Sequence, residues 1–103
     1  MVPLVQSRRA EIAEICRRFH IQRLGVFGSA ARDTDFDPAR SDVDLLVTYA
    51  PDLPRANQAE YFGLRDELSA LLGRPVDLVM SGAVRNPFIR ADIEQAREIL
   101  YAA

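Results

Sequence analysis

Two aspartates, Asp42 and Asp44, stand one residue apart at the start of an apolar stretch that continues to Val47. Side chains alternate between the two faces of a β-strand, so both carboxylates are expected on the same face. Two neighbouring anions repel each other and resist burial unless a positive charge lies between them. The pair therefore indicates a site for a divalent cation.

A third aspartate, Asp77, lies inside another apolar stretch, residues 76–80. If the two stretches form neighbouring strands, its carboxylate can approach those of Asp42 and Asp44. Such a triad could hold two Mg²⁺ ions about 4 Å apart, one activating an attacking oxygen and one neutralising a triphosphate, because Mg²⁺ prefers oxygen ligands. The alternative is that the three acids only end strands or face solvent, as acids at strand edges commonly do.

Upstream of the acids, Gly28 and Ser29 follow a third apolar stretch, residues 23–27. A glycine lets a phosphate approach backbone N–H groups closely, and the hydroxyl of Ser29 would add a donor. Arg32, one helical turn after Ser29, could bind a phosphate or pair with a neighbouring aspartate. The alternative is an ordinary strand-to-helix turn that Ser29 caps. Taken together with the acids, the turn favours a metal–nucleotide site.

The elements that must position these residues follow from the spacing of apolar side chains. That spacing predicts helices over 7–19 and 57–72, a helical turn over 29–32, and strands over 23–27, 43–48 and 76–80. A last helix is predicted to begin at Asn86 and Pro87, with an apolar face that extends to Leu100. This order of elements predicts an α/β or α+β fold in which helices pack on a small sheet.

Local signals refine the ends of these elements. Ser7 is a candidate N-cap for the first helix, and Gly73 is a candidate stop for the second. Glu14 and Arg18 have the spacing of an ion pair on one helix face.

Size and composition restrict the class of protein. The chain has 103 residues, which predicts one domain over 1–103. A net charge of −2 argues against direct nucleic-acid binding, which normally needs a basic excess. The single cysteine, Cys16, permits no internal disulfide, and with His20 it makes too small a set for a metal site. No apolar run is long enough to cross a membrane and no signal peptide is recognisable, so a cytoplasmic protein is expected.

The combined motifs resemble the signature of the DNA polymerase β-type nucleotidyltransferase superfamily: a Gly-Ser turn, a spacer of twelve residues here, and an Asp-x-Asp pair. Longer stretches resemble the minimal nucleotidyltransferases (MNT proteins) of prokaryotic HEPN–MNT toxin–antitoxin pairs. These stretches are Phe-Gly-Ser-Ala-Ala-Arg at 27–32, Ser-Asp-Val-Asp-Leu-Leu-Val at 41–47, Gly-Arg-Pro-Val-Asp-Leu-Val at 73–79 and Asn-Pro-Phe-Ile-Arg at 86–90. The resemblance covers nearly the whole chain.

The resemblance implies a polymerase β-like fold, with a small mixed sheet flanked by helices. It implies that Asp42, Asp44 and Asp77 are the metal-binding, catalytic triad and that Gly28 and Ser29 bind the triphosphate. The implied activity is Mg²⁺-dependent transfer of AMP from ATP to a HEPN-domain ribonuclease toxin, in at least some members to a tyrosine. Asp77 would be the base for the incoming hydroxyl, and a hetero-oligomer with the toxin is expected.

Asp33 departs from the family pattern, in which a glycine commonly follows the arginine of the turn. With Asp35 and Asp37 it makes an acidic loop that is expected to weaken nucleotide binding unless a metal or partner arginines compensate. Two other functions stay open. The chain could be a non-catalytic antitoxin that neutralises the toxin by binding, its acidic loop suiting a basic RNase cleft. It could also be a small-molecule nucleotidyltransferase subunit, a class that usually carries an additional helical domain.

Overall fold

A four-stranded mixed sheet forms the centre of the computed structural model, which describes residues 2–31, 36–37, 40–49, 58–80, 86–88, 91, 93 and 98–102. Its strand order is β3-β2-β1-β4. The strands are β1 (Ile21–Phe27), β2 (Val43–Tyr49), β3 (Val76–Met80) and β4 (Glu98–Ala102). β1 pairs antiparallel with β2 and β4, whereas β2 and β3 run parallel. The predicted mixed sheet is confirmed, with one strand more than the sequence indicated.

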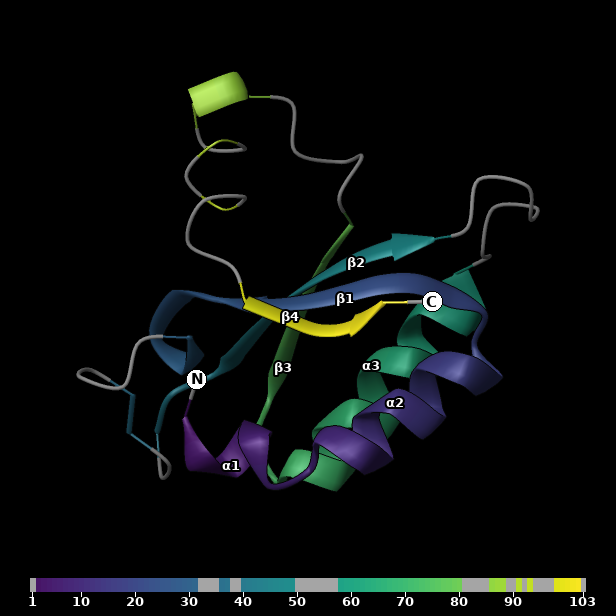
Figure 1. Ribbon diagram of the computed structural model, residues 1–103, viewed down its shortest axis with the longest axis horizontal. Coiled ribbons are helices and arrows are strands. Elements are labelled where there is room, and N and C mark those ends of the chain that lie inside the picture. The colour runs from purple at the N-terminus through teal and green to yellow at the C-terminus, as the bar shows by residue number, and fades with distance from the viewer. Residues whose placement is uncertain are drawn as a thin grey trace.

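Two helices, α2 (Arg9–Arg18) and α3 (Gln58–Leu72), lie on the same side of this sheet (Figure 1). A short helix, α1 (Pro3–Gln6), precedes α2, and one 3-10 turn, η1 (Gly28–Ala30), follows β1. The parallel pairing of β2 and β3 has α3 as its crossover, which is the usual way to connect parallel strands. No helix among the described residues is both long and apolar enough to cross a membrane.

The core lies between the sheet and the two helices. Alternate residues of β2 are buried on that side, beginning with Val43, and the helix stripes predicted from the sequence supply the other half of the core. The fully buried residues include Ile12, Cys16, Leu24, Val26, Val43, Leu45, Leu64 and Leu68. Burial of a side chain of this size contributes about 1.5–3 kcal/mol to stability. The even-numbered residues of β2 therefore belong to the opposite face of the sheet.

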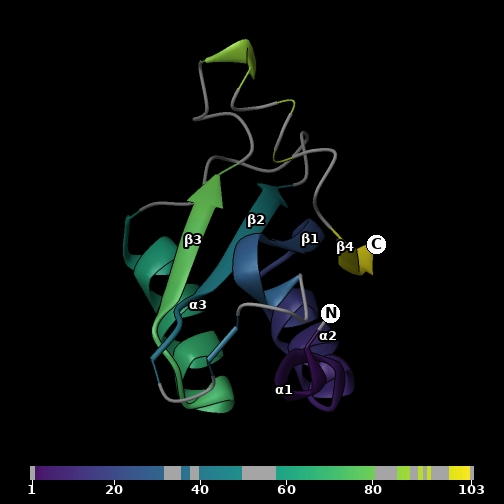
Figure 2. The same cartoon turned by 90° about the vertical axis from the view of Figure 1, so that its left-hand side faces the viewer.

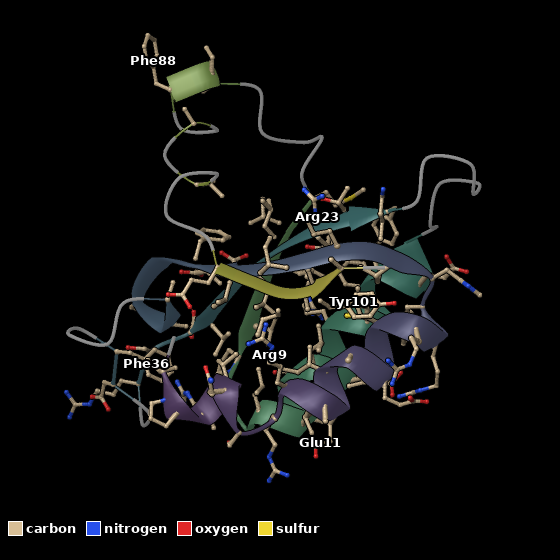
Figure 3. All side chains as sticks on the ribbon, viewed as in Figure 1. Arg9, Glu11, Arg23, Phe36, Phe88 and Tyr101 are labelled. Atoms are coloured by element: carbon tan, nitrogen blue, oxygen red, sulfur yellow. The ribbon has the colours of Figure 1, made fainter. Side chains whose placement is uncertain are left out.

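The last predicted helix is wrong at its end, because residues 98–102 form strand β4 against β1. Leu100 is buried as predicted, but in a strand, and it lies between Ile99 and Tyr101, two residues of high β propensity. The guanidinium of Arg9, which reaches from α2 towards β4 in Figure 3, donates to the carbonyl oxygen of Ile99 at 3.1 Å. Pairing with an open edge of the sheet thus outweighed helical periodicity.

The predicted helix start is confirmed, because the side chain of Asn86 accepts a hydrogen bond from the N–H of Phe88 at 3.0 Å. Helical geometry is recorded at residues 87–88, 91 and 93. The side chain of Phe88 is 81% exposed and lies far from α2 and α3 in Figure 3.

Two predictions for α2 are wrong. The helix begins at Arg9, and Ser7 does not cap it because its hydroxyl donates to the carbonyl oxygen of Leu4 at 3.2 Å. Glu14 pairs with Arg17 at 2.8 Å instead of with Arg18. Arg18 forms a salt bridge with Glu67 of α3 at 2.7 Å, a choice that only the packing of α2 on α3 makes available.

Candidate active site

Asp44 and Asp77 lie directly opposite each other on the parallel strands β2 and β3. Figure 2 shows these two strands side by side and pointing the same way. Residues in register on neighbouring strands project from the same face of a sheet. Because Val43 and Leu45 are buried beneath the helices, Asp44 and Asp77 belong to the other face. The predicted approach of these two acids is therefore present in the sheet.

Gly28 brings the turn after β1 into contact with Asp44. Phe27 is the register partner of Asp44 on the antiparallel side, so the turn begins beside this carboxylate. Gly28 has φ +67°, a left-handed conformation that side chains rarely adopt. A Cβ atom there would lie 3.3 Å from Cγ of Asp44 and would overlap one of its oxygens. Only glycine permits both the backbone angle and the close approach.

The helical turn predicted over 29–32 is present as the 3-10 segment η1 over Gly28–Ala30, and residue 32 lies outside the described residues. The fold of η1 is closed by a hydrogen bond from the Ala31 N–H to the Gly28 carbonyl oxygen, at 3.1 Å. The N–H of Val2 donates to the Ala30 carbonyl oxygen at 2.9 Å, which ties the N-terminal segment to the turn. Ser29 is half-buried in the middle of η1, and the N-cap position of this turn is held by Phe27. Arg32 and Asp33 lie outside the described residues.

Asp42 is exposed and stands immediately before β2, two positions ahead of Asp44. Ser41, the residue before it, is held by Asp37, because the Ser41 N–H donates to the Asp37 carbonyl oxygen at 2.8 Å. The Asp37 N–H donates in return to the Ser41 hydroxyl at 2.9 Å. The three predicted acids therefore come from one strand, its approach and one neighbouring strand.

The donor chemistry of these residues fits magnesium, although a complete protein cage is not formed. Within the described ranges, no three His, Cys, Asp or Glu side chains are grouped so that they could hold a metal ion. Mg²⁺ is commonly bound by one or two carboxylates together with substrate phosphates rather than by a cage of protein ligands. The pair Asp44 and Asp77, beside a turn that glycine keeps open, suits a cation that arrives with a nucleotide.

Sequence reasoning missed Arg74, whose Nε donates to the carbonyl oxygen of Ser41 at 3.0 Å. The contact joins residues 33 positions apart, so no local pattern signals it. Cys16 and His20 are excluded as a metal pair, as expected, because Cys16 is buried and His20 is exposed. Burial raises the pKa of the Cys16 thiol to about 12, which makes it an inert core residue.

Comparison with known proteins places this geometry in a family. Residues 9–100 match the nucleotidyltransferase domain. The chain is 36% identical to a protein of Methanocaldococcus jannaschii that carries the provisional name of protein adenylyltransferase, over 84% of this chain and 91% of that protein. It is 34% identical to the protein adenylyltransferase MntA of Thermococcus cleftensis, over 85% of this chain and 81% of the relative.

Solved structures agree on the fold. A minimal nucleotidyltransferase superposes with a TM-score of 0.74 at 29% identity, over 90% of this chain and 89% of the other. The MNT antitoxin in complex with the tri-AMPylated HEPN toxin of Shewanella oneidensis superposes with a TM-score of 0.67 at 20% identity, over 96% and 73%. The predicted enzyme class and polymerase β-like fold are confirmed. The chain belongs to the nucleotidyltransferase family and is one of its minimal members.

Proposed function

We propose that this chain is an antitoxin that transfers AMP from ATP to a tyrosine hydroxyl of a HEPN-domain ribonuclease toxin. Relatives at 36% and 34% identity are named as protein adenylyltransferases, the first provisionally. A structural neighbour is an MNT antitoxin bound to an AMPylated HEPN toxin. The cytoplasm, where such a toxin would meet its RNA substrates, is the proposed location.

The observation that carries the proposal is the register pairing of Asp44 with Asp77 beside the Gly28 turn. Gly28 and Ser29 would bind the triphosphate through backbone N–H groups and the serine hydroxyl, and Arg32 would contact a phosphate. Asp42 and Asp44 would hold the cation. Such a constellation performs nucleotidyl transfer mainly by positioning and by neutralising charge.

The reaction is a displacement at the α-phosphorus of ATP. The hydroxyl oxygen of the toxin forms a bond to this phosphorus, while the bond to the bridging oxygen of the β-phosphate breaks and pyrophosphate leaves. The proton of the hydroxyl passes to the carboxylate of Asp77, the general base. Magnesium, when bound, activates the attacking oxygen and neutralises the triphosphate. Asp77 is exposed, so a macromolecular hydroxyl can reach it.

The test is intact-mass spectrometry of a HEPN-domain toxin encoded beside this chain, after incubation with the chain, ATP and Mg²⁺. We expect the toxin to gain one or more adenylates, and peptide mapping should locate them on tyrosine. Asp42→Asn together with Asp44→Asn should abolish the gain while the chain keeps its thermal unfolding transition. Adenylate transfer by this double variant at the wild-type rate would refute the assignment of the acids.

A second candidate is an antitoxin that neutralises the toxin by binding alone. The exposed acids Asp37 and Asp42, which would suit a basic ribonuclease cleft, favour this candidate. This candidate predicts that the double variant still silences the toxin in a ribonuclease assay. The enzyme predicts that silencing requires ATP and is lost with the two carboxylates.

A further inference from the structure

The peptide groups on either side of Asp42 are both held by the turn between α3 and β3. Before Asp42, the Ser41 carbonyl oxygen accepts a hydrogen bond from Nε of Arg74 at 3.0 Å. After Asp42, the Val43 N–H donates to the Pro75 carbonyl oxygen at 2.9 Å. Two consecutive residues of one turn thus fix the backbone on both sides of a single aspartate.

Arg74 is itself anchored firmly. The preceding residue, Gly73, ends α3 with φ +67°, and its N–H donates to the Ser69 carbonyl oxygen at 2.8 Å. The Ser69 hydroxyl then donates to the carbonyl oxygen of Arg74 at 2.6 Å. Arg74 is therefore a half-buried residue whose side chain connects the fixed end of α3 to Ser41, just before β2.

The hydrogen bond from Arg74 to Ser41 is important because Asp42 lies outside β2. β2 begins at Val43, so the exposed Asp42 carboxylate depends on its two flanking peptides for its direction. The hydrogen bonds with Asp37 hold the N–H and hydroxyl of Ser41 but not its carbonyl group, which leads directly into Asp42. Release of this carbonyl would let the peptide plane rotate and carry the carboxylate away from Asp44.

We propose that Arg74 is a positioning residue that sets the Asp42 carboxylate relative to Asp44 and Asp77, and so controls the affinity for the nucleotide-bound cation. This inference rests on the proposed function of the site. Arg74 acts through the Ser41 carbonyl group, so a hydrogen-bond donor at the place of Nε is the essential feature. Misplacement of a reacting group by about 1 Å can cost roughly a hundredfold in rate.

Two substitutions of Arg74, by Gln and by Met, separate the role of the hydrogen bond from that of charge. The two new side chains are similar in size, and both lack the guanidinium. Gln places an amide nitrogen at the same distance along the side chain as Nε of arginine, whereas Met places a methyl group there. Arg74→Met removes the donor, and Arg74→Gln keeps it while removing the charge. Arg65→Ala is the control, because Arg65 lies on α3, pairs with Asp66 at 3.2 Å and stacks on Phe62.

The experiment measures Mn²⁺ binding in the presence of ATP by electron paramagnetic resonance, AMP transfer to the toxin, and thermal unfolding of each variant. We expect Arg74→Met to weaken Mn²⁺ binding and lower kcat by about tenfold or more, with a smaller change in KM for the toxin. Arg74→Gln should stay within about threefold of wild type, and Arg65→Ala should match wild type.

The outcomes separate the inference from the function on which it rests. Equal losses in the Met and Gln variants would show that the charge or volume of the guanidinium matters instead of the hydrogen bond, which overturns the inference. Unchanged binding and transfer with a lower unfolding temperature would assign Arg74 a purely structural role. If the wild type binds Mn²⁺ and ATP but transfers no AMP, the proposed function fails while the loss of binding in Arg74→Met still supports positioning. A wild-type chain that binds no Mn²⁺ overturns both.

Discussion

Asp44 near the start of β2 and Asp42 immediately before the strand reach solvent to different degrees, whereas the end of β2 carries a buried tyrosine hydroxyl. At the start, Asp42 is exposed and Asp44 is half-buried, and the backbone around them is tied down. At the end, the hydroxyl of Tyr49 is buried and has no hydrogen-bond partner among the described residues. Polar groups are thus accessible to solvent at one end of the strand, whereas a hydroxyl is buried at the other.

The difference follows from the two faces of the strand. Asp44 occupies an even position on the face away from the helices, and Tyr49 occupies an odd position on the packed face with Val43 and Val47. Asp42 precedes the strand and is exposed. An exposed carboxylate on a fixed backbone is suited to binding a cation, because its solvation can be exchanged for metal coordination. A buried hydroxyl without a hydrogen-bond partner cannot bind a cation in this way and lowers the stability of the fold.

The largest effect should come from Asp44→Asn at the start of β2. The substitution removes one of the two charges that face each other across β2 and β3, and AMP transfer should fall by roughly a hundredfold or more, as for loss of a preorganised electrostatic group. Asp66→Asn, an exposed acid of α3, is the control and should retain transfer. Steady-state kinetics with the toxin as acceptor will measure both. Near-normal transfer by Asp44→Asn would remove Asp44 from the site.

Two glycines with the same φ of +67° allow the Gly28 contact to be isolated. Gly73→Ala should cost only the strain of a left-handed alanine, about 1–2 kcal/mol of unfolding free energy, because its Cβ meets nothing within 4 Å. Gly28→Ala carries this strain and also pushes on the Asp44 carboxylate. It should be the less stable variant in urea titrations and should lose AMP transfer. Equal unfolding free energies for Gly28→Ala and Gly73→Ala would mean that the turn rearranges around the new methyl group without disturbing Asp44.

Much of this arrangement could be predicted from the sequence because local chemistry determines it. Apolar spacing located α2, α3, β2 and β3, and the acids inside apolar stretches marked the sheet face on which Asp44 and Asp77 lie. The identity of Gly28 reflects a backbone angle and a contact with Asp44, and a glycine before serine signals such a turn. Local rules suffice where a residue's role depends on its near neighbours in the chain.

The features that sequence reasoning missed depend on distant partners. Strand β4 forms because it can pair with the edge of β1. Arg18 pairs with Glu67 instead of Glu14 because α3 packs beside α2. Arg74 can contact Ser41 because the parallel pairing of β2 and β3 brings these two distant residues together. Tertiary contacts of this kind override intrinsic propensity and leave no local pattern.

A smaller effect is expected from pH, through the buried thiol of Cys16. The unfolded chain loses this proton near the ordinary pKa of 9.0, whereas the folded chain keeps it up to a pKa of about 12. The unfolded state then binds fewer protons, so stability should fall as pH rises from about 9 towards 12, by no more than about 1.4 kcal/mol per pH unit. The sequence contains no lysine, so no amine side chain titrates in this window.

Urea titrations between pH 8 and pH 11 will test this dependence. Cys16→Ala should be less stable at pH 8 because it leaves a small cavity, but its stability should decline less steeply with pH. Parallel slopes for the two chains would assign the decline to the tyrosines. Burial, together with the charges of Glu60 and Tyr61, raises the pKa of Tyr49, so this residue acts in the same direction.

The smallest effect compares the hydroxyl of Tyr49, at the end of β2, with that of Tyr61 on α3. The Tyr61 hydroxyl donates to the Leu78 carbonyl oxygen of β3, whereas that of Tyr49 has no partner among the described residues. Tyr61→Phe should therefore lower the unfolding free energy by about 1 kcal/mol, while Tyr49→Phe should leave it unchanged or raise it by up to about 1 kcal/mol. A loss in Tyr49→Phe as large as that in Tyr61→Phe would mean that the Tyr49 hydroxyl is satisfied in solution. The contrast between the two ends of β2 would then rest on the exposure of the acids alone.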